Sequence, residues 1–311
     1  MALIALAVGI FLLIKGGDWL MRAAVALSLR FSIPKIVIGM TVVSFATSAP
    51  ELIVSVQSAL GGHPDLALGN VVGSNIANLG LVLAIIIMIS PIDVTPSFYK
   101  TDWPMMMIAS LLFYFFIRND NSLQTHEGAI LFFLLLIFMV YLIKFQKNAV
   151  LDEAPEDDEA LPVKRTISYL FLGGFSLWLG SETLIKGAVS LAQNMGVSER
   201  IISVSIVSLG TSIPELSASL IAIINKEKAI SLGNLIGSNI FNILAVMGVT
   251  SMIQPVVIQD TGLLTNDIWW MLGISFLILP LVFFPRGFRL SWLDGLILFT
   301  LYGVFILPLF L

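Results

Sequence analysis

The chain carries two sequence motifs twice at a constant spacing, and this duplication limits its architecture more than any other feature. SFATSAPELIVSV at 44–56 matches SLGTSIPELSASL at 208–220 with seven identities in thirteen positions. GNVVGSNIAN at 69–78 matches GNLIGSNIFN at 233–242 with seven identities in ten. In both pairs the second copy lies 164 residues after the first. An ungapped register of this kind indicates that the chain consists of two homologous units.

Both units are apolar enough to lie in a membrane. Of the 311 residues, 58% are hydrophobic and 12% are charged, whereas soluble domains carry about 25% charged residues. The composition therefore excludes a soluble protein. Apolar segments close to the length that spans a bilayer, about 20 residues, recur from end to end. We predict ten spans near 2–27, 36–60, 66–89, 102–118, 127–145, 167–193, 201–224, 230–253, 267–284 and 291–310.

A hydrophilic segment divides the predicted spans into five and five. An odd number of spans per unit makes the second unit enter the membrane from the opposite side. The sequence therefore predicts an all-α polytopic membrane protein with ten transmembrane helices in two inverted five-helix repeats. We expect the first repeat at 1–145, an acidic cytoplasmic linker at 146–165 and the second repeat at 166–311. Repeats of this kind build many secondary transporters, with the substrate site at the midplane between the halves.

The orientation follows from the basic residues in the loops, because cytoplasmic loops carry an excess of Lys and Arg. Eleven lie in the loops after the odd-numbered spans and two in the other loops. The bias predicts that both termini lie outside the cell (inner) membrane and that the linker is cytoplasmic. Six carboxylates in the linker could bind regulatory calcium, but a solvated linker is the favoured interpretation.

Each unit places a proline and a glutamate inside an apolar span, as Pro50 with Glu51 and Pro214 with Glu215. Proline removes a backbone donor and breaks the helix upstream, and lipid cannot satisfy the freed carbonyls. We expect those carbonyls around Ser44 and Ser208. A carboxylate at the bilayer centre costs from about 3 to more than 10 kcal/mol, so it should face a cavity or a partner. A structural hydrogen bond between helices is the alternative role for each glutamate.

Neutral oxygen-bearing side chains stand at helical spacing around each glutamate. Hydroxyl and amide groups recur one turn apart, on the same face as the glutamate or on the neighbouring span. Any single hydroxyl could instead bond its own helix backbone. The candidate metal-ligand residues are Glu51, Glu215, Thr47, Ser48, Thr211, Ser212, Ser74, Ser238, Asn78, Asn242, Ser44 and Ser208.

This set of side chains selects a hard cation. Calcium takes six to eight oxygen ligands in a tolerant geometry, and sodium accepts similar oxygens. Zinc and copper prefer sulfur or imidazole, but the chain has no cysteine and its two histidines lie in predicted loops. Two glutamates neutralise one Ca²⁺ or two Na⁺, so the site could exchange these ions.

Two further groups of residues have structural interpretations. Asp18 with Arg22 and Glu182 with Lys186 are spaced i, i+4, so we expect salt bridges rather than ion ligands. Glycines in the second motif are expected to let helices approach closely. These glycines are Gly69, Gly73, Gly233 and Gly237.

At these motifs the chain resembles the cation/calcium antiporter superfamily, and within it the prokaryotic sodium/calcium exchangers. ATSAPEL at 46–52 and GTSIPEL at 210–216 are similar to the family's two repeat signatures, and GSNIAN and GSNIFN are similar to the companion helices. The resemblance implies that Glu51 and Glu215 are the principal calcium ligands. It also implies that the hydroxyls and the carbonyls of Ser44 and Ser208 line the ion sites.

The resemblance also indicates a departure from the family pattern. Some relatives carry an aspartate where Asn242 stands, and Asn242 would lie with Asn78 at the centre of the site. The missing carboxylate leaves the number of exchanged ions, and any coupling to potassium, open.

We expect a secondary antiporter that exchanges sodium for calcium by alternating access, with spans 1 and 6 moving across the core. The transported ions would be Ca²⁺ and Na⁺, with no cofactor, no nucleic acid and no obligatory protein partner. A proton/calcium or other divalent-cation antiporter of the same fold is one alternative, and a passive cation channel is another. An enzyme is not expected, because no nucleophile–base pair, metal-binding histidine cluster or nucleotide loop occurs.

Overall fold

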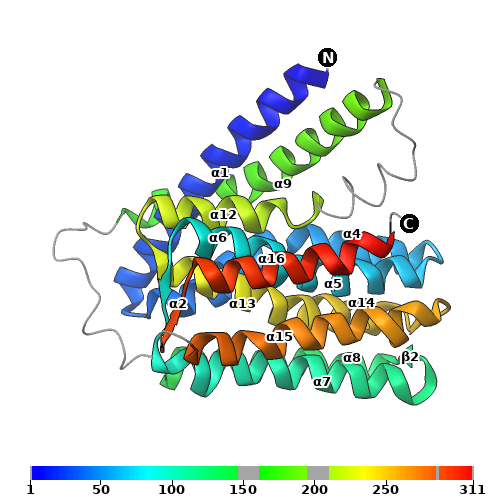
Figure 1. The fold of residues 1–311 in the computed structure, drawn as a ribbon. Helices are drawn as coiled ribbons and strands as arrows, with labels where there is room; N and C mark the ends of the chain where they lie inside the picture. The colour runs from blue at the N-terminus through cyan, green and yellow to red at the C-terminus, as the bar shows by residue number, and fades with distance from the viewer. Residues whose placement is uncertain (1, 146–160, 195–209, 285–286, 310–311) are drawn as a thin grey trace.

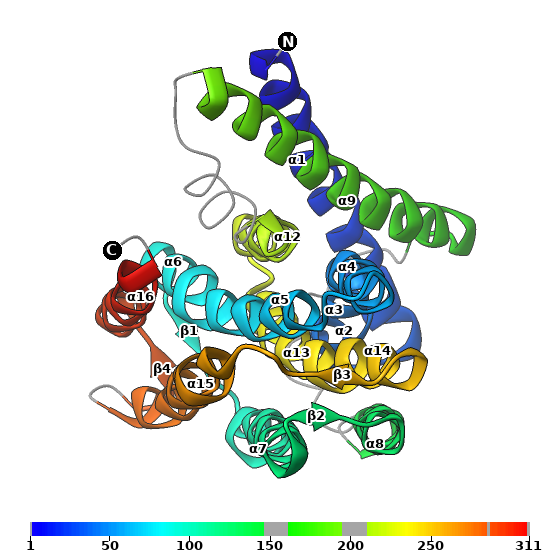
Figure 2. The ribbon, with the colours of Figure 1, turned by 90° about the vertical axis from the view of Figure 1, so that its right-hand side faces the viewer.

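A computed structural model describes residues 2–145, 161–194, 210–284 and 287–309. Long helices lie side by side in a bundle, and α1 and α9 lean away from it together as a crossed pair (Figures 1 and 2). The first half contains α1 (Ala2–Phe31), α2 (Lys35–Ile38), η1 (Gly39–Val43), α3 (Ser44–Thr47), α4 (Ala49–Leu60), α5 (Pro64–Ala77), η2 (Asn78–Leu83), α6 (Ala84–Ile89), β1 (Ile92–Asp93), η3 (Phe98–Asp102), α7 (Trp103–Asp120), β2 (Ser122–Leu123) and α8 (Thr125–Phe145).

In its described residues the second half follows the order of the first. It contains α9 (Val163–Asn194), α12 (Ile213–Ile224), α13 (Lys228–Phe241), η6 (Asn242–Met247), α14 (Gly248–Ile253), β3 (Val256–Val257), η7 (Leu263–Asp267), α15 (Ile268–Phe283), β4 (Arg289–Leu290), α16 (Trp292–Ile306) and η8 (Leu307–Leu309). In this list η1, η2, η3, η6 and η7 are π-helical turns, and η8 is a 3₁₀ turn.

The helices confirm a polytopic membrane protein. By length and hydropathy, five of the described helices can each span a bilayer. A sixth span arises when the pair Lys35–Thr47 and Ala49–Leu60, bent by 45°, is taken as one. The predicted span at 201–224 is described only from Gly210 onward, so the number of ten remains a prediction.

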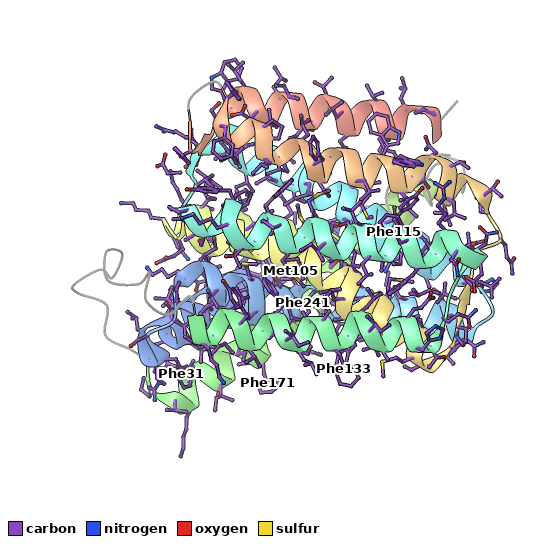
Figure 3. The ribbon with its side chains drawn as sticks, turned by 90° about the horizontal axis from the view of Figure 1, so that it is seen from below. Phe31, Met105, Phe115, Phe133, Phe171 and Phe241 are labelled. Atoms are coloured by element: carbon purple, nitrogen blue, oxygen red, sulfur yellow. The ribbon has the colours of Figure 1, made fainter. Side chains whose placement is uncertain are left out.

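Apolar side chains cover the outside of the bundle as well as its centre. Met105 and Phe241 are less than 10% exposed and pack between helices, whereas Phe115 and Phe133 are about 60% exposed on the surface (Figure 3). A water-soluble protein seldom exposes a large continuous apolar surface. The exposed phenylalanines are therefore positioned to contact lipid.

Short strand pairs and ion pairs connect loops from the two halves. β1 pairs antiparallel with β4, and β2 pairs with β3. Lys35, the first residue of α2, forms a 2.8 Å salt bridge with Glu227, in the loop after α12. The loops before α7 and α16 thus lie at one end of the bundle, and those before α8 and α15 at the other. This pairing of loops is what an inverted second half requires.

Glycines at helix crossings allow backbones to touch. A Cβ added to Gly233 would lie 2.3 Å from the Ile36 carbonyl oxygen, and one added to Gly237 would lie 2.5 Å from the Met40 Cα. The predicted close approach is confirmed for these two glycines, where α13 crosses α2 and η1. The described residues make no such approach at Gly69 or Gly73. The segment of the second half that corresponds to α2 and η1, and that would cross these two glycines, lies outside the described residues.

Candidate cation site

Both proline-containing spans break where the sequence predicts. Ser48 separates α3 from α4 with φ −88° and ψ 3°, and Ser212 precedes α12 with φ −87° and ψ 1°. Each proline then occupies the first turn of the new helix, where no backbone donor is needed. Glu51 and Glu215 lie in the same first turns, and a helix N-terminus stabilises a negative charge.

The Ser44 carbonyl, expected near the break, is engaged within its own helix. This oxygen accepts the backbone N–H of Ser48 at 2.9 Å and the Thr47 hydroxyl at 3.3 Å, so the break does not free it. Proline removes the bond to the residue four positions earlier, which for Pro50 is Ala46. Ser44 Oγ lies 2.9 Å from the Asn234 carbonyl oxygen and fastens α3 to α13. Ser208 lies outside the described residues.

The two glutamates of the repeat meet at the centre of the bundle. Both side chains are fully buried, and they are close enough for their charges to repel each other. Ser48 Oγ donates to Glu215 Oε1 at 3.2 Å. Thr47 and Ser238 also face the Glu215 carboxylate. The structure therefore brings together carboxylates that are 164 residues apart in the sequence.

Hydroxyl pairs connect the broken span of one half to the companion helix of the other. Thr47 Oγ1 lies 3.4 Å from Ser238 Oγ, and Thr211 Oγ1 lies 3.2 Å from Ser74 Oγ. The symmetry fails next to the glutamates. Among the described residues, Ser212 Oγ has no hydrogen-bond partner and does not repeat the Ser48–Glu215 bond.

Asn78 and Asn242 point their amide nitrogens across the interface between the halves. Asn78 Nδ2 donates to Asn239 Oδ1 at 3.2 Å, and Asn242 Nδ2 donates to Asn75 Oδ1 at 3.0 Å. Both side chains are fully buried, and these bonds leave both Oδ1 atoms without a partner in the described part of the chain.

A group of buried acceptor oxygens therefore lacks donors. Among the described residues it consists of both Glu51 carboxylate oxygens, Glu215 Oε2, the Oδ1 atoms of Asn78 and Asn242, and Ser212 Oγ. Leaving a buried acceptor unsatisfied costs about 1–3 kcal/mol, and more when it is charged. A cation satisfies such oxygens, and this donor set, with two carboxylates and no sulfur or imidazole, fits calcium and sodium.

Two asparagines that were not predicted as site residues join the halves. Asn75 Nδ2 donates to the Asn239 carbonyl at 3.2 Å, and Asn239 Nδ2 donates back to the Asn75 carbonyl at 3.4 Å. Both residues lie inside the repeated GSN sequence. Repetition of the amide in both copies was the available signal, but the exchange of bonds between copies could not be seen in the sequence.

A second pair of missed asparagines fixes the helix beyond each break. Asn70 Nδ2 donates to Ser55 Oγ at 3.0 Å, and Asn234 Nδ2 donates to Ser219 Oγ at 3.0 Å. Asn234 Oδ1 also accepts the Thr47 hydroxyl at 3.2 Å. These amides hold α4 against α5 and α12 against α13, and so position the carboxylate-bearing helices.

A π-helical turn begins at each central asparagine. η2 starts at Asn78 and η6 starts at Asn242, so both companion helices change their hydrogen-bonding pattern at the site. Such turns are rare and often occur at functional sites. Here they widen both companion helices at the level of the unpartnered amide oxygens.

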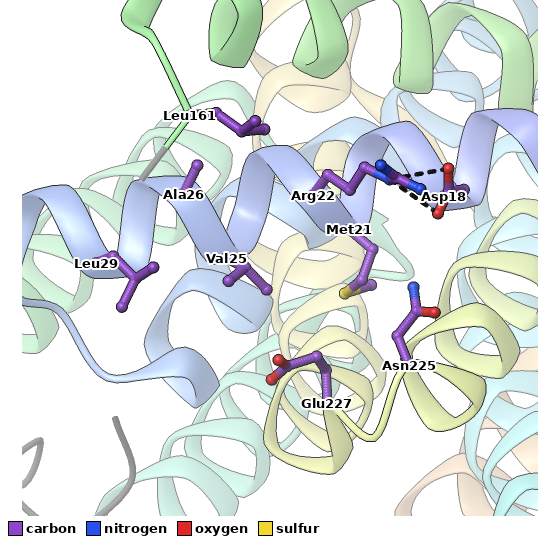
Figure 4. A pocket seen from close by; sticks show the side chains of 9 residues that line it. All are labelled: Asp18, Met21, Arg22, Val25, Ala26, Leu29, Leu161, Asn225 and Glu227. Atoms are coloured by element: carbon purple, nitrogen blue, oxygen red, sulfur yellow. Dashed lines mark hydrogen bonds and ion pairs between the residues drawn. The ribbon is translucent and has the colours of Figure 1, made fainter. Parts of the chain in front are cut away.

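The charged pairs on α1 and α9 have the predicted structural role. Arg22 Nε lies 3.0 Å from Asp18 Oδ2, and Lys186 Nζ lies 2.7 Å from Glu182 Oε2. Figure 4 shows the Asp18–Arg22 pair at the edge of a pocket that Glu227 also lines. Asp18 and Glu182 thus pair within their own helices, apart from the central carboxylates.

An oxygen-lined, carboxylate-bearing site inside a helical membrane bundle is typical of cation transporters. The chain belongs to the sodium/calcium exchanger protein family, which it matches over residues 1–144 and 166–311.

Individual relatives agree with this assignment. The antiporter CaxA of Alkalimonas amylolytica is 37% identical over 289 residues, which cover 89% of this chain and 88% of CaxA. The inner membrane protein YrbG of Escherichia coli (strain K12) is 34% identical, with 80% of this chain and 79% of YrbG covered. The solved structure of the sodium-calcium exchanger NCX_Mj, soaked without Na⁺ and Ca²⁺, superimposes with a TM-score of 0.84 at 25% identity and covers 98% of both chains.

Proposed function

We propose that this chain exchanges sodium for calcium across the membrane by alternating access, and that the two ions compete for Glu51 and Glu215. The observation that carries the proposal is the group of buried acceptor oxygens without donors around these glutamates. The family and the likeness to NCX_Mj support the same conclusion. The protein is accordingly a transporter.

Charge balance explains why the ions compete. Two ionised carboxylates in a low-dielectric interior repel each other, and neither is stable there without a counter-charge. One Ca²⁺ or two Na⁺ neutralise the pair. Because both kinds of cation use the same oxygens, binding of one displaces the other.

The other ligands we propose come from both halves. The amide oxygens of Asn78 and Asn242 face the site, and hydroxyls complete the six to eight oxygens that calcium takes. These hydroxyls belong to Thr47, Ser48, Ser74, Thr211, Ser212 and Ser238. We assign Ser44 a positioning role, since both its hydroxyl and its carbonyl are engaged by the protein. Ser208 remains a ligand proposed from the sequence alone.

The alternating-access part of the proposal concerns the two repeats, 1–145 and 166–311. Movement of α1 and α9 across the core would open the site first to one side and then to the other. The excess of Lys and Arg in the loops after the odd-numbered spans supports outward-facing termini and a cytoplasmic linker at 146–165. The relative YrbG, named as an inner membrane protein, supports the same location for this chain.

Exchange in proteoliposomes tests the proposal. We expect a sodium gradient to drive ⁴⁵Ca²⁺ uptake, and Glu51→Gln and Glu215→Gln each to abolish it. Glu182→Gln is the matched control, because Glu182 is half-exposed and paired with Lys186; it should retain uptake. Full exchange in either site variant would overturn the assignment.

The ion that drives uptake separates the alternatives. Uptake that follows a pH gradient and ignores sodium would establish a proton-coupled antiporter. Rapid calcium flux that needs no counter-ion would establish a channel. Sodium-dependent uptake that saturates with both ions is the result that we expect.

A further inference from the structure

An apolar groove of about 860 Å³ lies between α1, the broken span α2–α4, α8 and α9. Its walls include Phe31, Phe45, Phe132, Phe171 and Phe241. Figure 3, which views this side of the bundle, labels Phe31, Phe171 and Phe241 close to α8. Among the described residues no charged side chain lines the groove.

Among the described residues, the groove opens toward the lipid-facing surface of the bundle. Phe31 is 54% exposed, Phe45 is 60% exposed and Phe171 is 73% exposed. The hydroxyl of Thr41, which also lines the groove, donates to its own helix at the Val37 carbonyl. The lining therefore offers an occupant apolar contact and no free polar group among these side chains.

The length of the groove corresponds to one leaflet. Along α8 its lining runs from Phe132 to Ile143, which at about 1.5 Å per residue is a length of about 16 Å. The hydrocarbon core of a bilayer is about 30 Å thick. The lining is therefore long enough to hold one acyl chain that enters from a single leaflet.

Exposed basic side chains surround one mouth of the groove. Arg30 precedes Phe31, Lys144 follows Ile143, and Lys164 and Arg165 begin α9 six residues before Leu170 and Phe171. Arg30 also donates to the Leu161 carbonyl at 2.9 Å, which holds the start of α9 next to the end of α1. The last turns of α1 and α8 and the first two turns of α9 contain no acidic residue. Basic clusters at this depth attract anionic lipid headgroups.

We propose that this groove is a binding site for an anionic phospholipid, with one acyl chain inside it and the phosphate held by Arg30, Lys164 and Arg165. The apolar lining, the one-leaflet length and the basic mouth together fit a lipid and no water-soluble ligand. This site is separate from the cation site, so the proposal of lipid binding does not depend on whether the chain exchanges sodium for calcium.

The groove also touches the break that carries the cation site. Ala46, Ala49 and Pro50 line it on both sides of Ser48. A bound acyl chain packs against the bend just before Glu51. Lipid occupancy therefore changes the ease with which α3 and α4 move relative to each other.

Native mass spectrometry of the full chain tests lipid binding. In mixed phosphatidylglycerol and phosphatidylcholine we expect one phosphatidylglycerol to be retained per chain. The double variant Lys164→Gln/Arg165→Gln should bind it roughly 30-fold more weakly, from the removal of two surface charges next to a headgroup. Lys100→Gln/Lys226→Gln, which removes two exposed charges elsewhere, is the matched control and should bind normally.

A second variant fills the groove from the side of α9. A Cβ at Gly174 would meet only the Ala46 Cβ at 3.6 Å, which is ordinary contact. Gly174→Ala should fold and bind lipid. Gly174→Phe should exclude the acyl chain and lose the retained lipid, while its unfolding temperature stays equal to that of the parent protein. Retained phosphatidylglycerol in Gly174→Phe would overturn the site.

The acidic linker is the competing occupant of the basic mouth. If it covers Lys164 and Arg165, replacing its six carboxylates with amides will increase phosphatidylglycerol retention, and the double basic variant will leave retention unchanged. That pair of results would overturn the headgroup assignment. Retention that falls in the double variant, with or without the linker acids, supports it.

Discussion

We predict that Gly237→Ala destabilises the protein at the point where α13 crosses η1. A Cβ there would lie 2.4 Å from Ser44 Oγ, 2.5 Å from the Met40 Cα and 2.7 Å from the Met40 carbonyl oxygen. Two of these atoms are backbone, so η1 has to move away from α13. Overpacking of this kind costs about 3 kcal/mol, and alanine returns about 1 kcal/mol of helix propensity. We expect a net loss of about 2 kcal/mol in the free energy of unfolding.

The same displacement reaches the cation site. Ser44 and Thr47 contact Asn234 at 2.9 and 3.2 Å, and Thr47 lies 3.4 Å from Ser238. Loss of about one hydrogen bond at the site should weaken the apparent calcium affinity about tenfold. Thermal unfolding in detergent measures the first effect, and the calcium dependence of exchange in proteoliposomes measures the second.

A matched glycine controls for helix propensity. Gly303 lies on the lipid-facing side of α16, with no described atom within 4 Å of an added Cβ. Gly303→Ala should leave stability equal or slightly higher and calcium affinity unchanged. If Gly237→Ala matched Gly303→Ala in both measurements, the contact between α13 and η1 would not be tight, and the reasoning from it would fail.

Two further predictions concern hydrogen bonds at the centre. Ser212 Oγ is a buried hydroxyl without a described partner, so Ser212→Ala should stabilise the ion-free protein by about 1 kcal/mol and weaken calcium binding. Unfolding measured in chelator and in calcium compares the stability of the ion-free and the calcium-bound protein. A variant that is less stable than the parent protein in chelator would contradict this prediction. Asn75→Ala and Asn239→Ala should each cost about 1–3 kcal/mol, and because they share bonds the double variant should cost less than the sum. Additive losses in that double-mutant cycle would show that the two amides act independently.

The constant offset of 164 residues was sufficient to predict that the two halves are related copies whose matching motifs meet. It placed the motifs of Glu51 and Glu215 together at the centre, whereas the pairing of β1 with β4 and of β2 with β3 was not predicted. The i, i+4 spacing likewise predicted the pairs on α1 and α9, since these contacts are local.

The sequence could not show contacts that arise only between the halves. Asn75 and Asn239 lie in the motif, but their exchange of bonds depends on how α5 crosses α13. The π-helical turns at Asn78 and Asn242 have no compositional signal that distinguishes them from regular helix. The hydrogen bonds of the Ser44 carbonyl also depend on local geometry, because the backbone bond that Pro50 cannot make is the one to Ala46.

The mutual bonds of Asn75 and Asn239 have a consequence for the origin of the chain. Residue i bonds residue j while j bonds i, which is the pattern of a symmetric dimer interface. Two identical, oppositely inserted units could form this contact without a linker, but they would have to present the same residues to both sides of the membrane. In the joined chain, Glu227 pairs with Lys35 on one side, while its counterpart on the other side is His63. Fusion thus allowed the two membrane faces to acquire different charges, and with them a fixed orientation.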